Sequence, residues 1–85
     1  MNTIAVIGQK GGTGKTTLAE ILVVAAELEG IVTAAIDLDP QASLCHWSDL
    51  REAETPIVID TQPARLPKTL ETAKAQGVGL CIIDT

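Results

Sequence analysis

One short segment of the chain carries the residue types that bind phosphate. Residues 9–17 read Gln-Lys-Gly-Gly-Thr-Gly-Lys-Thr-Thr. Glycines have no Cβ, so successive backbone N–H groups can close around phosphate oxygens, and a helix that starts there adds its positive end. A lysine can then reach the β- and γ-phosphates, and a neighbouring hydroxyl can bind Mg²⁺. The segment predicts a nucleotide-binding loop formed by Gly11, Gly12, Thr13, Gly14, Lys15, Thr16 and Thr17.

Acidic residues at the ends of apolar runs are candidates for the metal site. Asp37 and Asp39 end one such run just before Pro40, and Asp84 ends another. An acid at the carboxyl end of a strand can bind Mg²⁺ directly or through water. We therefore expect Mg²⁺ to be bound by Thr16, Asp37 and Asp84.

Length and composition limit the possible classes of protein. Eighty-five residues suffice for one small domain, and 46% hydrophobic residues with Trp47 as the only aromatic residue predict an aliphatic core. A net charge of -5 leaves no basic patch for a nucleic-acid backbone. Cys45 and Cys81 are too far apart in the sequence for a C-x-x-C motif, so we expect reduced thiols in a cytoplasm. The longest apolar run, residues 21–26, is far below the roughly 20 residues that cross a bilayer.

Apolar, β-prone runs alternate with amphipathic segments along the chain. The runs predict strands at residues 3–7, 31–38, 57–59 and 80–84. The segments between them predict helices at residues 18–28, 42–52 and 67–76, with Gly30 and Gly77 closing the first and the last. Strands that alternate with helices indicate parallel neighbours, so we expect a three-layer α/β fold with a mainly parallel sheet.

The spacing of apolar residues also predicts which sides of the helices face the core. In the first helix, the expected inward face consists of Leu18, Ile21, Leu22, Ala25 and Leu28. In the second helix, Leu44 and Trp47 are expected to point inward.

Three motifs together resemble the deviant Walker A ATPases of the ParA/MinD family. Residues 9–17 resemble the Walker A loop, with Gln9 where the strict pattern has glycine and with an additional lysine at Lys10. Residues 37–41 resemble switch I, also called A′, and residues 80–84 resemble the Walker B strand. The resemblance spans the whole chain. The residues of these motifs are most similar to those of the ParA-type partition ATPases. It implies that residues 1–85 are the N-terminal half of one P-loop NTPase domain.

The resemblance also implies roles that the spacing alone does not. Lys10 would reach across an ATP-sandwich homodimer to the phosphates of the other subunit, and Asp39 would position the attacking water; with Lys15, these are the expected catalytic residues. The sheet order would be 57–59, 32–38, 80–84, 3–7, with the last strand at an edge.

The implied function is that of a Mg²⁺-dependent ATPase that dimerises with ATP and partitions DNA. A centromere-binding adaptor would stimulate hydrolysis. Nonspecific DNA would bind through regions outside this chain. DNA binding would place the protein in the cytoplasm, on the nucleoid. The 85 residues alone would be a weak or inactive ATPase. Two alternatives remain: a MinD-like membrane-associated positioning ATPase, and a small-molecule ligase of the dethiobiotin synthetase type.

Overall fold

The computed structural model describes residues 1–7, 14–40, 42–51 and 55–85. Strands and helices alternate along these residues. The strands are β1 (Asn2–Val6), β2 (Thr33–Asp37), β3 (Ile57–Asp60) and β4 (Leu80–Asp84). The helices are α1 (Lys15–Leu28), α2 (Ser43–Arg51) and α3 (Leu66–Ala75), and a short 3-10 turn (Pro63–Arg65) precedes α3. The predicted α/β class is confirmed.

The four strands form one sheet in the order β1-β4-β2-β3, and every neighbouring pair is parallel. This is the order that the family resemblance implies, and β1 lies at an edge of the sheet as expected. Parallel neighbours require crossover connections, and α1, α2 and α3 provide them. The last residues of the strands are in register, so that Val6, Asp84, Asp37 and Asp60 form one row across the sheet.

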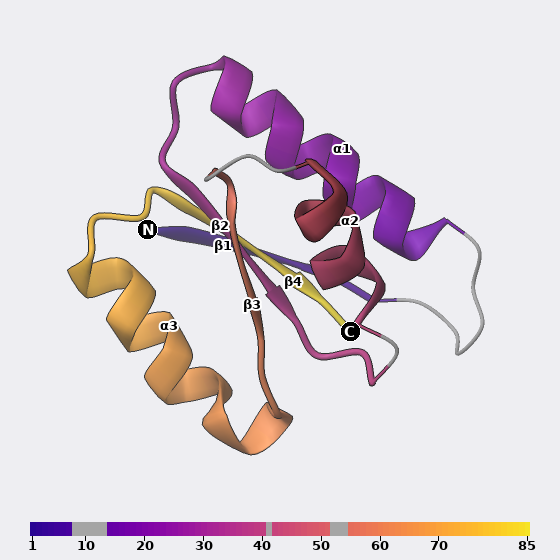
Figure 1. Cartoon of the computed structure of the whole chain (residues 1–85). Coiled ribbons are helices and arrows are strands. Elements are labelled where there is room, and N and C mark those ends of the chain that lie inside the picture. Colours follow the sequence, from indigo (N-terminus) through magenta and orange to yellow (C-terminus); the bar gives the residue numbers. More distant parts are fainter. Residues whose placement is uncertain (8–13, 41, 52–54) are drawn as a thin grey trace.

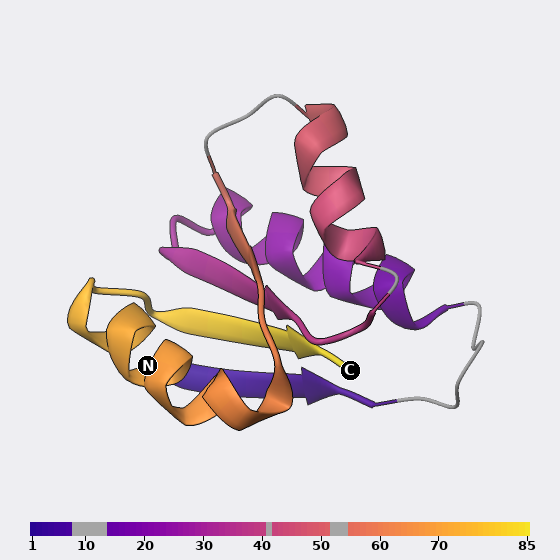
Figure 2. The ribbon, with the colours of Figure 1, turned by 60° about the horizontal axis from the view of Figure 1, so that its bottom comes forward.

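Helices cover both faces of the sheet, which gives three layers (Figures 1 and 2). Helices α1 and α2 pack on one face, over a core made of Val6, Ala19, Val23, Ala35, Leu44 and Ile82. Helix α3 packs on the other face, over Ala34, Ile36, Ala73, Val78, Cys81 and Ile83. Both cores are aliphatic, as the composition predicts. Trp47 is only partly buried, at the margin of the first core.

The predicted inward face of α1 is wrong in most of its positions. The buried residues are Ala19, Val23 and Ala26, with Leu22 partly buried beside them. Leu18, Ile21, Ala25 and Leu28 are exposed, Leu28 to 83%. Residues 21–26 are apolar on every side of the helix, so their spacing does not distinguish one face from another. Small residues form the buried face because they let the helix backbone lie close to the sheet.

The predicted helix ends agree with the structure. Gly30 and Gly77 follow α1 and α3 with φ of 80° and 88°, the left-handed conformation that a glycine adopts without a Cβ clash. Helix α3 begins at Leu66, one residue before Pro67, and the 3-10 turn before it was not predicted. Within the described ranges, no helix combines the length and the apolar character needed to span a bilayer.

Candidate nucleotide site at the carboxyl edge of the sheet

The strand–loop–helix order that a phosphate-binding loop requires is present at this edge. Strand β1 ends at Val6 and α1 begins at Lys15, and the N–H of Leu18 donates to the carbonyl of Gly14 at 2.8 Å in the first turn. Thr17 is exposed on that turn. Residues 8–13 lie outside the described residues, and with them the predicted Lys10, Gly11, Gly12 and Thr13. The predicted phosphate-binding segment therefore reaches the N-terminus of α1.

Three carboxylates lie side by side at the ends of neighbouring strands. Asp37 ends β2 and is in register with Asp84 on β4 and with Asp60 on β3. Register partners on parallel strands point to the same face of a sheet. Because the Asp37 carboxylate contacts α2, this is the face that α1 and α2 cover. The structure thus brings together two of the predicted metal-binding acids, Asp37 and Asp84.

Asp37 is a buried helix cap, with 1% of its surface exposed. Its Oδ2 accepts the backbone N–H groups of Leu44 at 3.1 Å and Cys45 at 3.3 Å, both in the first turn of α2. Its Oδ1 accepts the N–H of Asp39 at 3.0 Å. These donors are the groups that a helix N-terminus leaves without partners inside the helix.

Asp84 is fully buried where the sheet meets α1. Its carbonyl accepts the N–H of Leu38 at 2.9 Å, and the next residue, Thr85, donates both its N–H and its hydroxyl to the carbonyl of Val6. Glu20 on α1 lies close enough to Asp84 for the two charges to interact. Burial, and to a smaller extent the negative charge of Asp84, raise the pKa of the Glu20 carboxyl. Asp84 is therefore fixed between β1 and β2, next to the helix that follows the phosphate loop.

Asp39 lies on the loop that leads from β2 to α2, and it is half-buried. Its carbonyl accepts the N–H of Ala42 at 2.9 Å. The loop borders a cleft of about 290 Å³ between this segment and the residues that follow β3, with Asp37, Asp60 and Pro63 among its lining residues. Asp39 is also among the residues that line this cleft.

Burial and several nearby aspartates raise the pKa of a thiol in this region. The pKa of the Cys45 thiol on α2 rises from 9.0 to about 11. Burial is the main cause, followed by the charges of Asp37 and Asp60, a hydrogen bond with Asp37, and the charge of Asp49. The sequence could have indicated Asp60, because it ends a predicted strand. The proximity of Glu20 to Asp84 depends on how α1 packs, and no sequence signal marks it.

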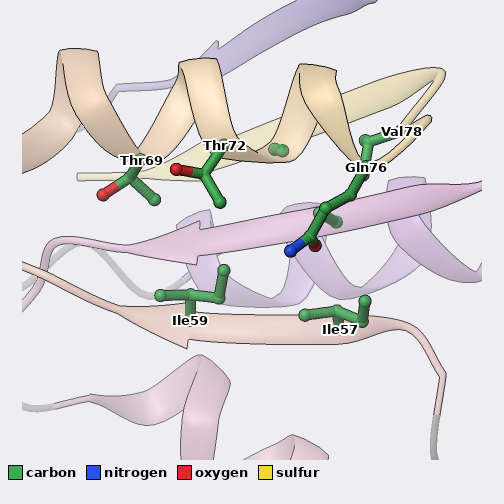
Figure 3. Close-up of a pocket in the computed structure, with 8 residues that line it drawn as sticks. Ile57, Ile59, Thr69, Thr72, Gln76 and Val78 are labelled. Atoms are coloured by element: carbon green, nitrogen blue, oxygen red, sulfur yellow. The ribbon is translucent and has the colours of Figure 1, made fainter.

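A second groove, of about 140 Å³, lies on the opposite face of the sheet. Figure 3 shows Ile57 and Ile59 of β3 facing Thr69 and Thr72 of α3 across it, with Gln76 extending toward the sheet. Asp37 and Asp84 do not line this groove, so it is separate from the candidate nucleotide site.

Comparison with known proteins gives the class of this domain. Residues 4–80 match the CobQ/CobB/MinD/ParA nucleotide binding domain. The chain therefore belongs to this family of nucleotide-binding domains, and the resemblance seen in its motifs is confirmed.

Two relatives match nearly all of the chain. Protein ParA of Rhizobium radiobacter is 29% identical over 86 residues, covering 99% of this chain and 38% of its own length. Maintenance of carboxysome distribution protein A of Gloeobacter kilaueensis is 34% identical over 83 residues, covering 96% of this chain and 37% of its own length. The chain thus spans less than two-fifths of the length of either relative.

Proposed function

We propose that this chain is the nucleotide-binding part of a ParA-type partition ATPase, which dimerises when it binds ATP. The observation that carries the proposal is the row of strand ends: Asp84 and Asp37 are adjacent at the carboxyl edge, beside the start of α1. The membership of the family and the relative named ParA support it. The relative named for carboxysome distribution indicates that the cargo can differ while the nucleotide site is shared.

Each site residue has a proposed role in ATP hydrolysis. Gly11, Gly12, Thr13 and Gly14 cradle the phosphates with backbone N–H groups, together with Thr16 and Thr17 at the helix start. Lys15 neutralises charge on the β- and γ-phosphates. Asp39 orients the attacking water from the loop that borders the cleft.

The described carboxylates fit a magnesium site. Mg²⁺ prefers oxygen ligands and keeps several waters, and Asp84 and Asp37 supply buried carboxylate oxygens next to each other. The Asp37 carboxylate would reach the ion through a metal-bound water. Together with the Thr16 hydroxyl, these residues would bind the ion, which supplies positive charge against the transferred phosphoryl group.

Lys10 makes the proposed site depend on a second subunit. An additional lysine in the loop can reach phosphates bound by a partner copy, as an arginine finger does in other phosphoryl-transfer enzymes. ATP is then part of the dimer interface, and hydrolysis weakens that interface. A centromere-binding adaptor would accelerate this step, and nonspecific DNA would bind the dimer through regions outside this chain.

Nucleotide binding by the Lys15→Ala variant of the whole protein tests the phosphate site. Loss of the cation that faces the phosphates removes charge-assisted hydrogen bonds, and each is worth about 1.5–3 kcal/mol. We expect Mg·ATP affinity to fall at least about tenfold in titration calorimetry, and turnover to be lost with it. Lys68→Ala, on the exposed surface of α3, is the control and should bind ATP normally. Normal ATP affinity and turnover in Lys15→Ala would rule out the phosphate loop.

A further inference from the structure

The carboxylate of Asp37 joins two parts of the candidate site that are separate in the sequence. One oxygen bonds the backbone of Asp39, and the other bonds the first turn of α2 at Leu44 and Cys45. A buried carboxylate is tolerated when its oxygens accept hydrogen bonds, and bonds to a charged acceptor are stronger than neutral ones. The positive end of α2 adds to this stabilisation. The position of the loop is thus coupled to the position of the helix through one side chain.

Ala42, which lies between these two points, has a constrained backbone. Ala42 adopts a positive φ of 53°, which is uncommon for a residue with a Cβ. Its N–H donates to the carbonyl of Asp39, and its own carbonyl accepts the N–H of His46 at 3.0 Å. Asp39 therefore has its N–H bonded to Asp37 and its carbonyl bonded to Ala42, the residue that precedes α2.

We infer that Asp37 is a positioning residue for Asp39: it sets where the Asp39 carboxylate lies in the cleft by bonding the loop and α2 at once. Asp37 need not touch the nucleotide or the attacking water for this. The inference rests on the proposed function in one respect, the role of Asp39 in hydrolysis. The hydrogen bonds of the Asp37 carboxylate, on which the rest of the inference is based, do not depend on ATP.

Amide hydrogen exchange measured in the absence of nucleotide tests the structural half. Asp37→Ala removes both oxygens that accept these three N–H groups. Asp37→Asn keeps one accepting oxygen, enough for the cap of α2, but its amide N–H₂ cannot accept from the other side. We expect exchange at Asp39, Leu44 and Cys45 to accelerate at least about tenfold in Asp37→Ala, and exchange at Asp39 alone to accelerate in Asp37→Asn.

Asp60→Asn is the matched control, since it neutralises the register partner of Asp37 on β3, whose side chain is exposed. It should leave exchange at Asp39 and Leu44 unchanged. If Asp37→Ala does not fold, Asp37→Asn carries the test. Unchanged protection of Asp39 in a folded Asp37→Asn variant would overturn the inference.

A double-mutant cycle on ATP turnover by the whole protein tests the functional half. At saturating Mg²⁺, where the proposed metal contact of Asp37 is not limiting, Asp37→Asn should lower kcat about tenfold or more with little change in KM for ATP, and should have no further effect in an Asp39→Ala background. Independent, multiplicative effects of the two substitutions would contradict the inference. So would a lowered kcat in Asp37→Asn at saturating Mg²⁺ with intact protection of Asp39, because the substitution would then act without moving the loop. Absence of ATP turnover in the unmodified protein would instead refute the proposed function, while the exchange experiment would still decide the role of Asp37.

Discussion

Asp37 and Asp84 are register partners at the carboxyl ends of two neighbouring parallel strands, and both are buried. The backbone also joins them, because the N–H of Leu38 donates to the carbonyl of Asp84. The two carboxylates consequently lie on one side of the sheet, near α1 and α2. Like charges this close in a buried setting raise each other's free energy unless donors or cations compensate them. The cap on α2 compensates Asp37, and a bound cation would compensate both acids.

Substitution of Asp39 should separate ATP binding from hydrolysis. Asp39 is proposed to act on the attacking water and not on the bound phosphates, so Asp39→Ala should bind ATP with nearly normal affinity. Its turnover should fall by about 10²-fold or more, because a positioned catalytic group contributes roughly that much. The dimer should then persist with ATP. Steady-state turnover and equilibrium ATP binding, measured on the same sample, check this prediction. Wild-type turnover would make Asp39 a structural acid of the loop.

Truncation of Leu44 should show how far α2 stabilises the sheet. Leu44 is fully buried in the core beneath α1 and α2. Leu44→Ala should lower the free energy of unfolding by about 2–5 kcal/mol, from lost apolar burial and the cavity left behind. Leu50→Ala on the same helix is the matched control, because Leu50 is 85% exposed and should change stability by about 0.5 kcal/mol or less. Urea denaturation followed by Trp47 emission measures both variants in the 85-residue chain, where Trp47 is the only aromatic residue.

The thiol of Cys45 should react slowly at neutral pH. Its pKa is raised to about 11 by burial and by nearby aspartates, so the reactive thiolate is scarce below that pH. The alkylation rate should rise steeply as pH increases from 9 to 11, a range over which the rate of an ordinary thiol only about doubles. Asp37→Asn removes one of the charges responsible and should accelerate alkylation at pH 8. Peptide mass spectrometry distinguishes Cys45 from the fully buried Cys81, and a rate that levels off at pH 9 would contradict the prediction.

The sequence predicted the arrangement of strands better than the packing of helices. Glycines at helix ends and β-prone runs depend on local residue types and predicted the elements, whereas the observed order of β1 to β4 was implied by the family resemblance of the motifs. The face of α1 was predicted wrongly, because several apolar residues surround that helix and the buried side is selected by how closely it approaches the sheet. In this case Ala19 and Val23 are buried and Leu28 is exposed.

The sequence predicted which residues form the candidate site, but it predicted only part of the interactions between them. Asp37, Asp39 and Asp84 were identified from their positions at strand ends. The hydrogen bonds from Leu44 and Cys45 to Asp37 were not, because they form across seven and eight residues of chain and depend on how α2 returns to the sheet. For the same reason, the effect of Asp84 on Glu20 became visible only once α1 was placed.

The dimerisation of a Lys10→Ala variant with a non-hydrolysable ATP analogue tests the central claim most directly. If Lys10 acts in trans, its charge meets phosphate only when two subunits face each other. The Lys10→Ala variant of the whole protein should therefore bind the analogue with nearly normal affinity but remain monomeric in light scattering, while the unmodified protein and Lys68→Ala dimerise. Mixing Lys10→Ala with Asp39→Ala subunits, each capable of binding ATP, should give fewer dimers than Asp39→Ala alone. Full analogue-dependent dimerisation of Lys10→Ala on its own would contradict the account and would favour a small-molecule ligase on the same scaffold.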